Sequence, residues 1–325
     1  LGEMQRKISR NDKRLIRNLK RESDILIYFL MQFLYSALLD ADKTDAGLGD
    51  IRIGRTNIES DIVDQYRKRN NFLEPKKSID KLRNDIYYAV TMEAGKLDLN
   101  ERILSLNVPT GTGKTQTALS FAMKLRERLH EEKEFTPRVI YALPFLSIID
   151  QNYGVFEEIL NGDNKNPNSS VLLKHHHLAE IKYSDDEETY DAGKSQLLLE
   201  GWNSEVIVTT FWQVFHTLFS NRKSMLRKFN KLANAIIILD EVQSIPHQYW
   251  KLMRDALMIL CQKFNSYVIL VTATQPLIFD EEKGEIRKLA IKKDEYFKSL
   301  DRIELIHHID VSYTLDEFGE LIEND

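Results

Sequence analysis

The sequence predicts an α/β fold with a mostly parallel sheet, preceded by a helical segment. Three observations lead to this prediction. A glycine-rich loop, Pro-Thr-Gly-Thr-Gly-Lys-Thr at residues 109–115, closes one apolar stretch. An Asp-Glu-Val-Gln box at residues 240–243 closes another. Between residues 98 and 300, short β-branched runs alternate with segments of helical periodicity, a pattern typical of a parallel sheet covered by helices.

The glycine-rich loop has the features of a phosphate-binding site. Ile103–Val108 before it reads as a buried strand, and Thr117–Leu129 after it reads as an amphipathic helix. The loop is therefore expected at a helix N-terminus, where free backbone N–H groups and the helix dipole favour phosphate. Gly111 and Gly113 let the backbone curl around the anion.

Side chains of the same loop are expected to hold ATP and magnesium. Lys114 should reach the β- and γ-phosphates, and the Thr115 hydroxyl should ligate the metal. Pro109 and the absence of the usual first glycine give the loop the form found in superfamily 2 helicases. With the first acid of the Asp-Glu-Val-Gln box, the predicted cofactor-binding residues are Thr110, Gly111, Thr112, Gly113, Lys114, Thr115 and Asp240.

The Asp-Glu-Val-Gln box follows Ala235–Leu239, an unbroken run typical of a central parallel strand that is buried on both faces. Ligands of open α/β sheets bind at the carboxyl ends of the strands. Asp240 is expected to hold magnesium through its water shell, and Glu241 to polarise the attacking water as a general base. The predicted catalytic residues are Lys114, Glu241 and Gln243.

Further segments line up at the ends of the other expected strands. The strands are Arg138–Leu143, Ser170–Lys174, Glu205–Thr209, Ala235–Asp240 and Tyr267–Thr272. The segments at residues 141–151, 209–214 and 271–276 follow three of them, in the order of the superfamily 2 helicase motifs. This order predicts a RecA-like P-loop NTPase domain. The predicted nucleic-acid contacts are Pro144, Thr209, Thr210 and Gln213. The last three carry neutral hydroxyls or an amide, which bind a backbone without reading its sequence. Thr272 and Thr274 are predicted to couple hydrolysis to that groove through Gln243.

Two other side-chain groups have less specific interpretations. The aromatic residues Phe211, Trp212, Phe215 and Phe219 fall at helical spacing and are predicted to be core, although Trp212 could contact a strand. The run at residues 175–177 makes a poor metal chelate, because adjacent residues on a strand point to opposite faces. Arg83 precedes the first strand by about the distance of an adenine-contacting segment, but no glutamine motif accompanies it.

The composition of the chain limits its size class, its partners and its location. A chain of 325 residues has room for about two domains, and its net charge of −5 gives no global basic field. Cys261 is the single cysteine, so a reducing, cytoplasmic location is expected. The apolar stretch Ile25–Leu39 is expected to be a buried helix, because it is short for a membrane span and contains Gln32 and Ser36. No membrane partner is expected.

The glycine-rich loop, the Asp-Glu-Val-Gln box, Leu143–Phe145 and Thr272–Pro276 together resemble the CRISPR-associated helicase–nuclease of type I interference systems. In that family an HD-type nuclease domain precedes the helicase. Residues 34–46 are similar to the last helix of such a domain, where an Ala-Asp supplies an acidic ligand for a divalent transition metal. This ligand maps onto Asp42. The resemblance implies an intact protein that uses ATP and magnesium, is recruited to the crRNA-guided Cascade complex, and moves along single-stranded DNA while cutting it.

The sequence departs from the family at both ends. The family's nuclease needs histidine ligands upstream of Asp42, and every histidine lies downstream: His130, His175, His176, His177, His216, His247, His307 and His308. No nuclease activity is therefore expected of this chain alone, because one carboxylate cannot build a two-metal site. The chain starts at Leu1, which suggests a fragment, and it ends before a second RecA-like domain that would supply arginine fingers. Weak ATP binding and hydrolysis are expected.

The sequence thus predicts three parts. Residues 1–97 form a helical segment, the C-terminal part of an HD-type domain plus a linker; residues 98–300 form the first RecA-like domain; and residues 301–325 form a bridge toward the second. The predicted function is that of an ATP-dependent single-stranded DNA translocase or helicase in CRISPR interference. Two alternatives stay open: another superfamily 2 ATPase acting on RNA or in DNA repair, and a non-catalytic, nucleotide-regulated nucleic-acid-binding module.

Overall fold

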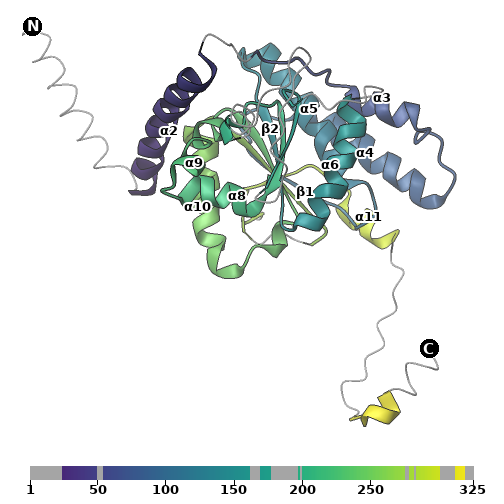
Figure 1. The fold of residues 1–325 in the computed structure, drawn as a ribbon. Coiled ribbons are helices and arrows are strands. Elements are labelled where there is room, and N and C mark those ends of the chain that lie inside the picture. Colours follow the sequence, from purple (N-terminus) through teal and green to yellow (C-terminus); the bar gives the residue numbers. More distant parts are fainter. Residues whose placement is uncertain are drawn as a thin grey trace, which may run out of the picture.

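The fold was analysed in a computed structural model, which describes residues 24–49, 54–161, 169–176, 197, 200–274, 278–281, 283–300 and 312–318. In this part of the chain, strands form one sheet in the order β3-β4-β2-β5-β6-β1-β7, and every pairing is parallel. Helices cover both faces of the sheet (Figure 1). The predicted α/β class, with its mostly parallel sheet, is confirmed.

Apart from β7, the strands agree with the sequence pattern to within two residues at each end. They are β1 (Ile103–Asn107), β2 (Arg138–Leu143), β3 (Leu172–His175), β4 (Val206–Thr210), β5 (Ala235–Asp240), β6 (Tyr267–Thr272) and β7 (Arg287–Lys288). The sequence missed β7, because its two exposed, charged residues at the sheet edge carry no apolar pattern.

Side chains alternate between two hydrophobic cores along each central strand. Ile236 and Ile238 of β5 face one core, and Ile237 and Leu239 face the other. The first core lies under α3 (Ile62–Arg69), α4 (Ser78–Lys96), α5 (Lys114–Lys133) and α6 (Leu146–Asn161). The second lies under α2 (Asp24–Leu48), α8 (Phe211–Phe219), α10 (Trp250–Lys263) and the short η1 (Phe229–Leu232), which α9 (Lys223–Leu226) precedes. The remaining elements are η2 (Val242–Ser244), η3 (His247–Tyr249) and α11 (Lys293–Lys298).

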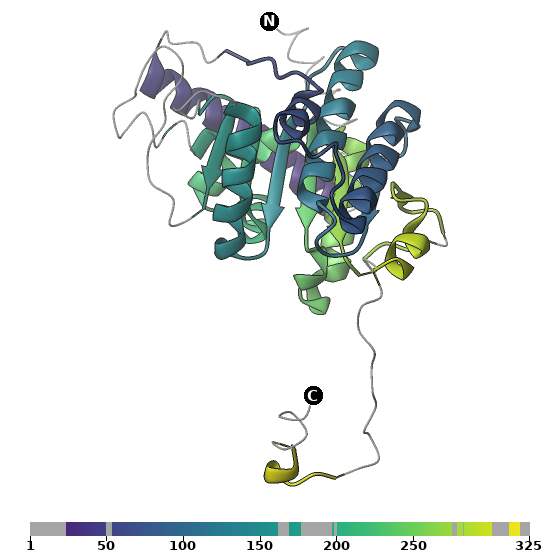
Figure 2. The ribbon, with the colours of Figure 1, turned by 90° about the vertical axis from the view of Figure 1, so that its right-hand side faces the viewer.

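The N-terminal helices lie on opposite faces of the sheet. In Figure 1, α2 lies on the left and α3 and α4 lie on the right, and Figure 2 shows the same layers from the side. The predicted division of the chain into three parts at residues 97 and 300 stays a prediction. Most of the predicted bridge, residues 301–325, lies outside the described residues, as do residues 1–23.

Helix α2 buries one face only, whereas the sequence predicted a buried helix. Phe29 and Ser36 are fully buried against the core, but Met31, Leu34 and Leu38 are exposed. The segment Ile25–Gly47 is long and apolar enough to span a membrane by length and composition, and 22% of its most apolar window is buried. The burial is one-sided because α2 packs on the outermost layer, against α9 and η1.

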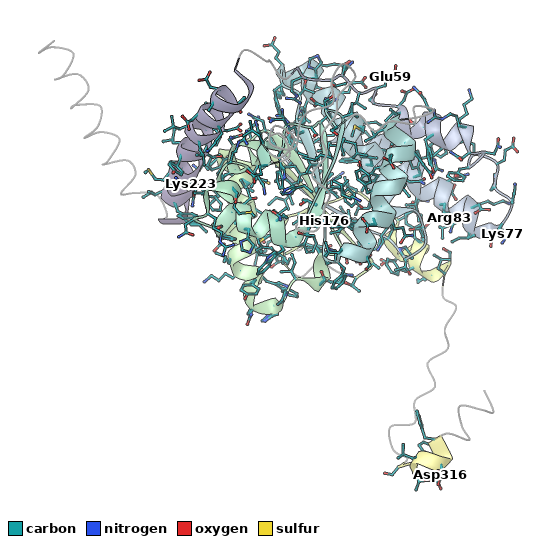
Figure 3. All side chains as sticks on the ribbon, viewed as in Figure 1. Glu59, Lys77, Arg83, His176, Lys223 and Asp316 are labelled. Carbon is teal, nitrogen blue, oxygen red and sulfur yellow. The ribbon has the colours of Figure 1, made fainter. Side chains whose placement is uncertain are left out.

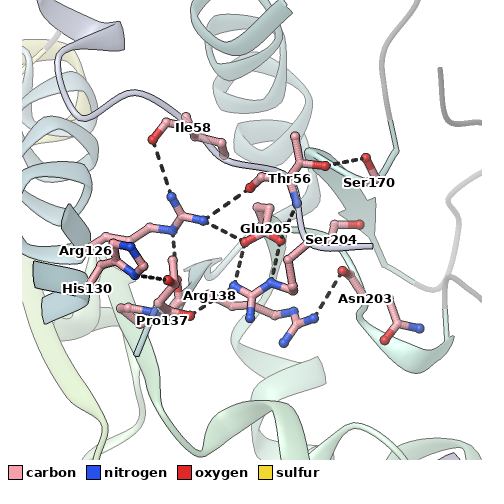
Figure 4. Close-up of polar contacts among 12 residues, drawn as sticks. Thr56, Ile58, Arg126, His130, Pro137, Arg138, Ser170, Asn203, Ser204 and Glu205 are labelled. Carbon is pink, nitrogen blue, oxygen red and sulfur yellow. Dashed lines mark hydrogen bonds and ion pairs between the residues drawn. The ribbon is translucent and has the colours of Figure 1, made fainter. Parts of the chain in front are cut away.

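A strap of residues 54–61 joins the two sides of the sheet at the start of β4. Glu205, which is fully buried, accepts hydrogen bonds from Arg55 Nε at 2.6 Å and Arg126 Nη2 at 2.8 Å, and from the Thr56 backbone N–H (Figure 4). Burial alone would raise the pKa of this carboxyl, but hydrogen bonding and charge from Arg55, with the charge of Arg126, lower it.

Candidate nucleotide site and nucleic-acid rim

The glycine-rich loop curls at the N-terminus of α5, as predicted from the sequence. Gly111 and Gly113 adopt φ values of 77° and 83°, a left-handed region that favours glycine. Thr112 is buried, and its Oγ1 donates to the carbonyl of Pro109 at 2.7 Å. Arg83, labelled on α4 in Figure 3, donates from Nε to the Gly111 carbonyl at 2.8 Å. The loop is thus held from within and from the neighbouring helix.

Two of the predicted catalytic side chains meet above this loop. Lys114 Nζ lies 2.7 Å from Glu241 Oε1, although 127 residues separate them in sequence. Lys114 is largely buried, and Glu241 adopts a φ of 57°, which is uncommon for a residue with a Cβ. Backbone strain of this kind clusters at functional sites. Here it places the carboxylate of Glu241 beside the lysine that is predicted to bind phosphate.

Asp240 lies beneath this pair, at the carboxyl end of β5. It is buried, and its carboxylate accepts the Tyr141 hydroxyl at 2.6 Å and the backbone N–H of Glu241 at 2.9 Å. Burial is the main cause that raises the pKa of Asp240, and it also raises that of Tyr141. Burial disfavours the charged form of this carboxyl group. A bound cation would compensate the negative charge, so the position suits a metal ligand.

The predicted magnesium ligands share one neighbour. The side chains of Thr115 and Asp240 both interact with the Tyr141 hydroxyl. Thr115 Oγ1 also donates to Asn152 Oδ1 on α6 at 3.2 Å. Hydroxyl, carboxylate and amide oxygens are the hard ligands that Mg²⁺ takes in proteins, so this donor set fits the ion. Asn152 was not singled out from the sequence, because it belongs to no part of the loop or the box.

The predicted coupling residues join the nucleotide site through Gln243. Gln243 Nε2 donates to Glu241 Oε2, and Gln243 Oε1 accepts from Thr272 Oγ1 at 2.7 Å. Thr272 Oγ1 lies 3.2 Å from Thr274 Oγ1 and accepts from the Thr274 backbone N–H at 3.0 Å. A continuous series of polar contacts therefore leads from Lys114 to the end of β6.

A cavity of about 510 Å³ adjoins the glycine-rich loop on the side of α3 and α4. Its walls include Arg67, Phe72, Arg83 and Asn84, together with Gly111, Thr112, Gly113, Thr115 and Gln116. The Arg67 guanidinium is buried 3.9 Å from the centroid of the Tyr87 ring, and its Nη2 donates to Asn84 Oδ1 at 2.5 Å. The sequence did not single out Arg67, Phe72 and Asn84, because α3, α4 and the turn between them carry no motif.

The predicted nucleic-acid contacts lie at the same rim, but most of them are buried. Thr209 Oγ1 donates to the carbonyl of His175 at 2.7 Å, and Thr210 Oγ1 caps α8 by accepting from the Gln213 backbone N–H. Gln213 Oε1 accepts from the buried Lys228 Nζ at 3.2 Å. Pro144 is partly exposed. Their role as nucleic-acid contacts stays a prediction.

The remaining predicted metal ligand stands apart. Asp42 is exposed on α2, and the described residues contain no cluster of three or more metal-ligating side chains. Its neighbour Asp40 instead forms ion pairs with Arg227 at 2.8 Å and Lys231 at 2.9 Å, which fix α2 to the core. A metal role for Asp42 stays a prediction.

The fold and the site together define a helicase-type motor domain of the P-loop NTPase class. The chain belongs to the family described as type III restriction enzyme, res subunit, whose model matches residues 61–277. It is 35% identical over 205 residues to the CRISPR-associated nuclease/helicase Cas3 of Haloferax volcanii, which confirms the resemblance read from the motifs. That match covers 59% of this chain, but the chain spans only 21% of the relative's length.

A solved structure has a similar fold. The Cas3-ATP crystal structure from T. fusca superimposes with a TM-score of 0.52 at 19% identity, covering 85% of this chain and 28% of that one. At this identity the likeness concerns the fold alone.

Proposed function

We propose that this chain is the first motor domain of an ATP-dependent translocase or helicase that moves along single-stranded DNA in CRISPR type I interference. The observation that carries the proposal is the series of contacts from Lys114 through Glu241 and Gln243 to Thr272. A nucleotide-binding lysine, a general base and a polar connection to the opposite part of the rim are what a nucleic-acid-driven ATPase requires.

Each residue then has a definite task in hydrolysis. Lys114 leaves Glu241 to bind the β- and γ-phosphates, which frees the carboxylate to orient and deprotonate the attacking water. Thr115 and Asp240 would hold Mg²⁺, which neutralises phosphate charge when bound. The cavity beside Arg67 and Phe72 would take the base and the ribose, because it opens directly onto the loop.

The wider context follows from the named relative. In the intact protein, an HD nuclease domain would precede the motor domain, with the C-terminal part of that HD domain within residues 1–97 of this chain. The crRNA-guided Cascade complex would recruit the protein in the cytoplasm. The exposed apolar face of α2, with Met31, Leu34 and Leu38, supports a neighbouring domain on that side. The RNA-directed or repair ATPase and the non-catalytic module are the competing functions.

ATP turnover with single-stranded DNA, with RNA, and without nucleic acid separates these functions. We expect slow turnover by the 325-residue chain, stimulated by DNA and abolished in Lys114→Ala. Lys96→Ala is the matched control, because Lys96 is exposed on α4. Stimulation by RNA alone would favour the alternative helicase. Nucleotide binding without turnover under any condition, including in a longer protein with both motor domains, would favour the non-catalytic module.

A further inference from the structure

An apolar groove opens on the rim, beside the predicted nucleic-acid contacts. Its volume is about 560 Å³, and we call it the aromatic groove. It is formed by Pro144 and Phe145 after β2, by the outer face of α8, and by the segment Ser244–Leu252 after β5. Three segments that follow neighbouring strands thus build one concave surface.

Aromatic rings form the exposed walls of this groove. Phe145, Trp212 and Tyr249 are 58%, 67% and 44% exposed. The rings of Phe215 on α8 and Tyr249 on η3 meet edge-on, with their centroids 6.4 Å apart. Trp212 packs edge-on against the ring of His216 at 4.5 Å, which supports it from one side and leaves the rest of the indole accessible.

The side chains predicted to contact the nucleic-acid backbone at this rim are already engaged within the fold. The side chains of Thr209, Thr210 and Gln213 are buried, and each forms a hydrogen bond within the fold. A strand that crosses this part of the rim therefore meets aromatic faces. Such faces accept any base, because every base has a π-face, and they bind without sequence preference.

The exposed positive charges beside the groove favour a polyanionic ligand. Residues 206–239 contain five lysines and arginines and no acidic residue, but three of the five, Arg227, Lys228 and Lys231, are engaged within the fold by Asp40 or Gln213. Arg222 and Lys223 are exposed beyond the end of α8, where Lys223 is labelled in Figure 3, and Lys251 is exposed beside Leu252. In the part of the chain that the structure describes, none of these three cations forms an ion pair. Exposed cations flanking aromatic rings suit the backbone and bases of a single strand.

We propose that the aromatic groove is a base-stacking site for single-stranded nucleic acid, with Trp212 and Phe145 as its main platforms. The inference rests on the proposed function, which it deepens by assigning contacts to the bases. The sequence interpretation of the aromatic residues as core holds for Phe211, which is buried, but not for Trp212.

The test compares two probes on the 325-residue chain: oligodeoxythymidine of about 12 nucleotides, a length within typical site sizes, and the same strand with abasic sites. Fluorescence anisotropy gives the ratio of their dissociation constants. We expect the intact strand to bind about 5-fold to 100-fold more tightly, because a stacked base contributes that much to affinity. Trp212→Ala with Phe145→Ala should bring the ratio close to one, and Trp212→Phe should largely preserve it.

Tyr88→Ala is the matched control, because Tyr88 is a half-exposed aromatic residue on α4, on the opposite face of the sheet. It should leave the ratio unchanged, and an unchanged melting temperature would show that the groove variants fold. Equal binding of intact and abasic strands by the unsubstituted chain, or an unchanged ratio in the groove variants, would overturn the stacking site and leave the proposed function standing. Failure to bind either strand would overturn both.

Discussion

Thr272 donates a hydrogen bond from Oγ1 to Gln243 Oε1 at 2.7 Å, and this contact joins the end of β6 to the candidate nucleotide site. Through its other atom, Nε2, Gln243 binds Glu241, which contacts Lys114. An amide has one donor and one acceptor end, so the orientation of Gln243 is fixed by its two partners. A change at either end can reach the other by turning one side chain.

Removing the Thr272 hydroxyl should weaken this communication. We expect Thr272→Val to reduce the effect of a bound magnesium–ATP analogue on DNA affinity from the usual range of about 5-fold to 150-fold toward none. DNA affinity measured with and without the analogue gives this ratio. Thr91→Val is the control, because Thr91 is also buried but its hydroxyl bonds only its own helix. An unchanged ratio in Thr272→Val would show that coupling takes another route.

Asp240→Asn should abolish turnover but stabilise the chain in the absence of magnesium. Burial raises the folded-state pKa of this carboxyl, so its contribution to stability is greatest below its unfolded pKa and is lost as pH rises through the folded value. Urea unfolding at pH 4 and pH 7, with magnesium chelated, measures this. The advantage of the asparagine variant should be larger at pH 7. A variant that is less stable at both pH values would contradict this account.

Glu205→Gln should be among the most destabilising single changes. It would leave Arg126 buried without its carboxylate, and breaking a buried ion pair typically costs about 3–5 kcal/mol. The pKa of Glu205 is lowered, so its stabilisation is present above the unfolded pKa and lost as pH falls. Glu132→Gln is the control, because Glu132 pairs with Arg128 on the surface of α5. Removing this pair should change the free energy of unfolding by less than about 1 kcal/mol. Equal effects of the two variants would refute the role of the buried cluster.

Because Lys228 is buried, we expect the stability of the chain to depend on pH in the alkaline range. Burial lowers its pKa to about 8 from 10.5, so the unfolded chain binds more protons between these values. Stability should therefore rise with pH across this window, by up to about 3 kcal/mol, relative to Lys228→Met. Urea unfolding from pH 7 to 10.5 measures the difference, with the exposed Lys223→Met as control. A constant difference between Lys228→Met and the unsubstituted chain would mean that this lysine titrates normally.

Much of the fold was predictable because the central strands are buried on both faces. The bounds of β5 and β6 came directly from runs such as Ala235–Leu239, where every residue is apolar. The meeting of Lys114 with Glu241 was also predictable, since the carboxyl ends of parallel strands share one rim. The start of α5 differed, because the helix begins at Lys114, immediately after Gly113, and not at Thr117.

Contacts between segments without a motif could not be predicted. Periodicity placed Trp212 on the same helix as Phe211, but it could not show which of the two the neighbouring elements would cover. Gln213 is a polar residue in a helicase motif, and nothing in its own segment indicates that Lys228, fifteen residues later, takes its side chain into the interior. Such outcomes depend on tertiary packing, which outweighs local pattern.

The central claim is that Lys114 and Asp240 form a magnesium–ATP site. Isothermal titration calorimetry of the 325-residue chain with a non-hydrolysable ATP analogue tests it most directly. We expect weak binding that depends on magnesium and is lost in both Lys114→Ala and Asp240→Asn, with Lys96→Ala unaffected. Binding that is equally strong without magnesium, or that survives in Lys114→Ala, would contradict the account.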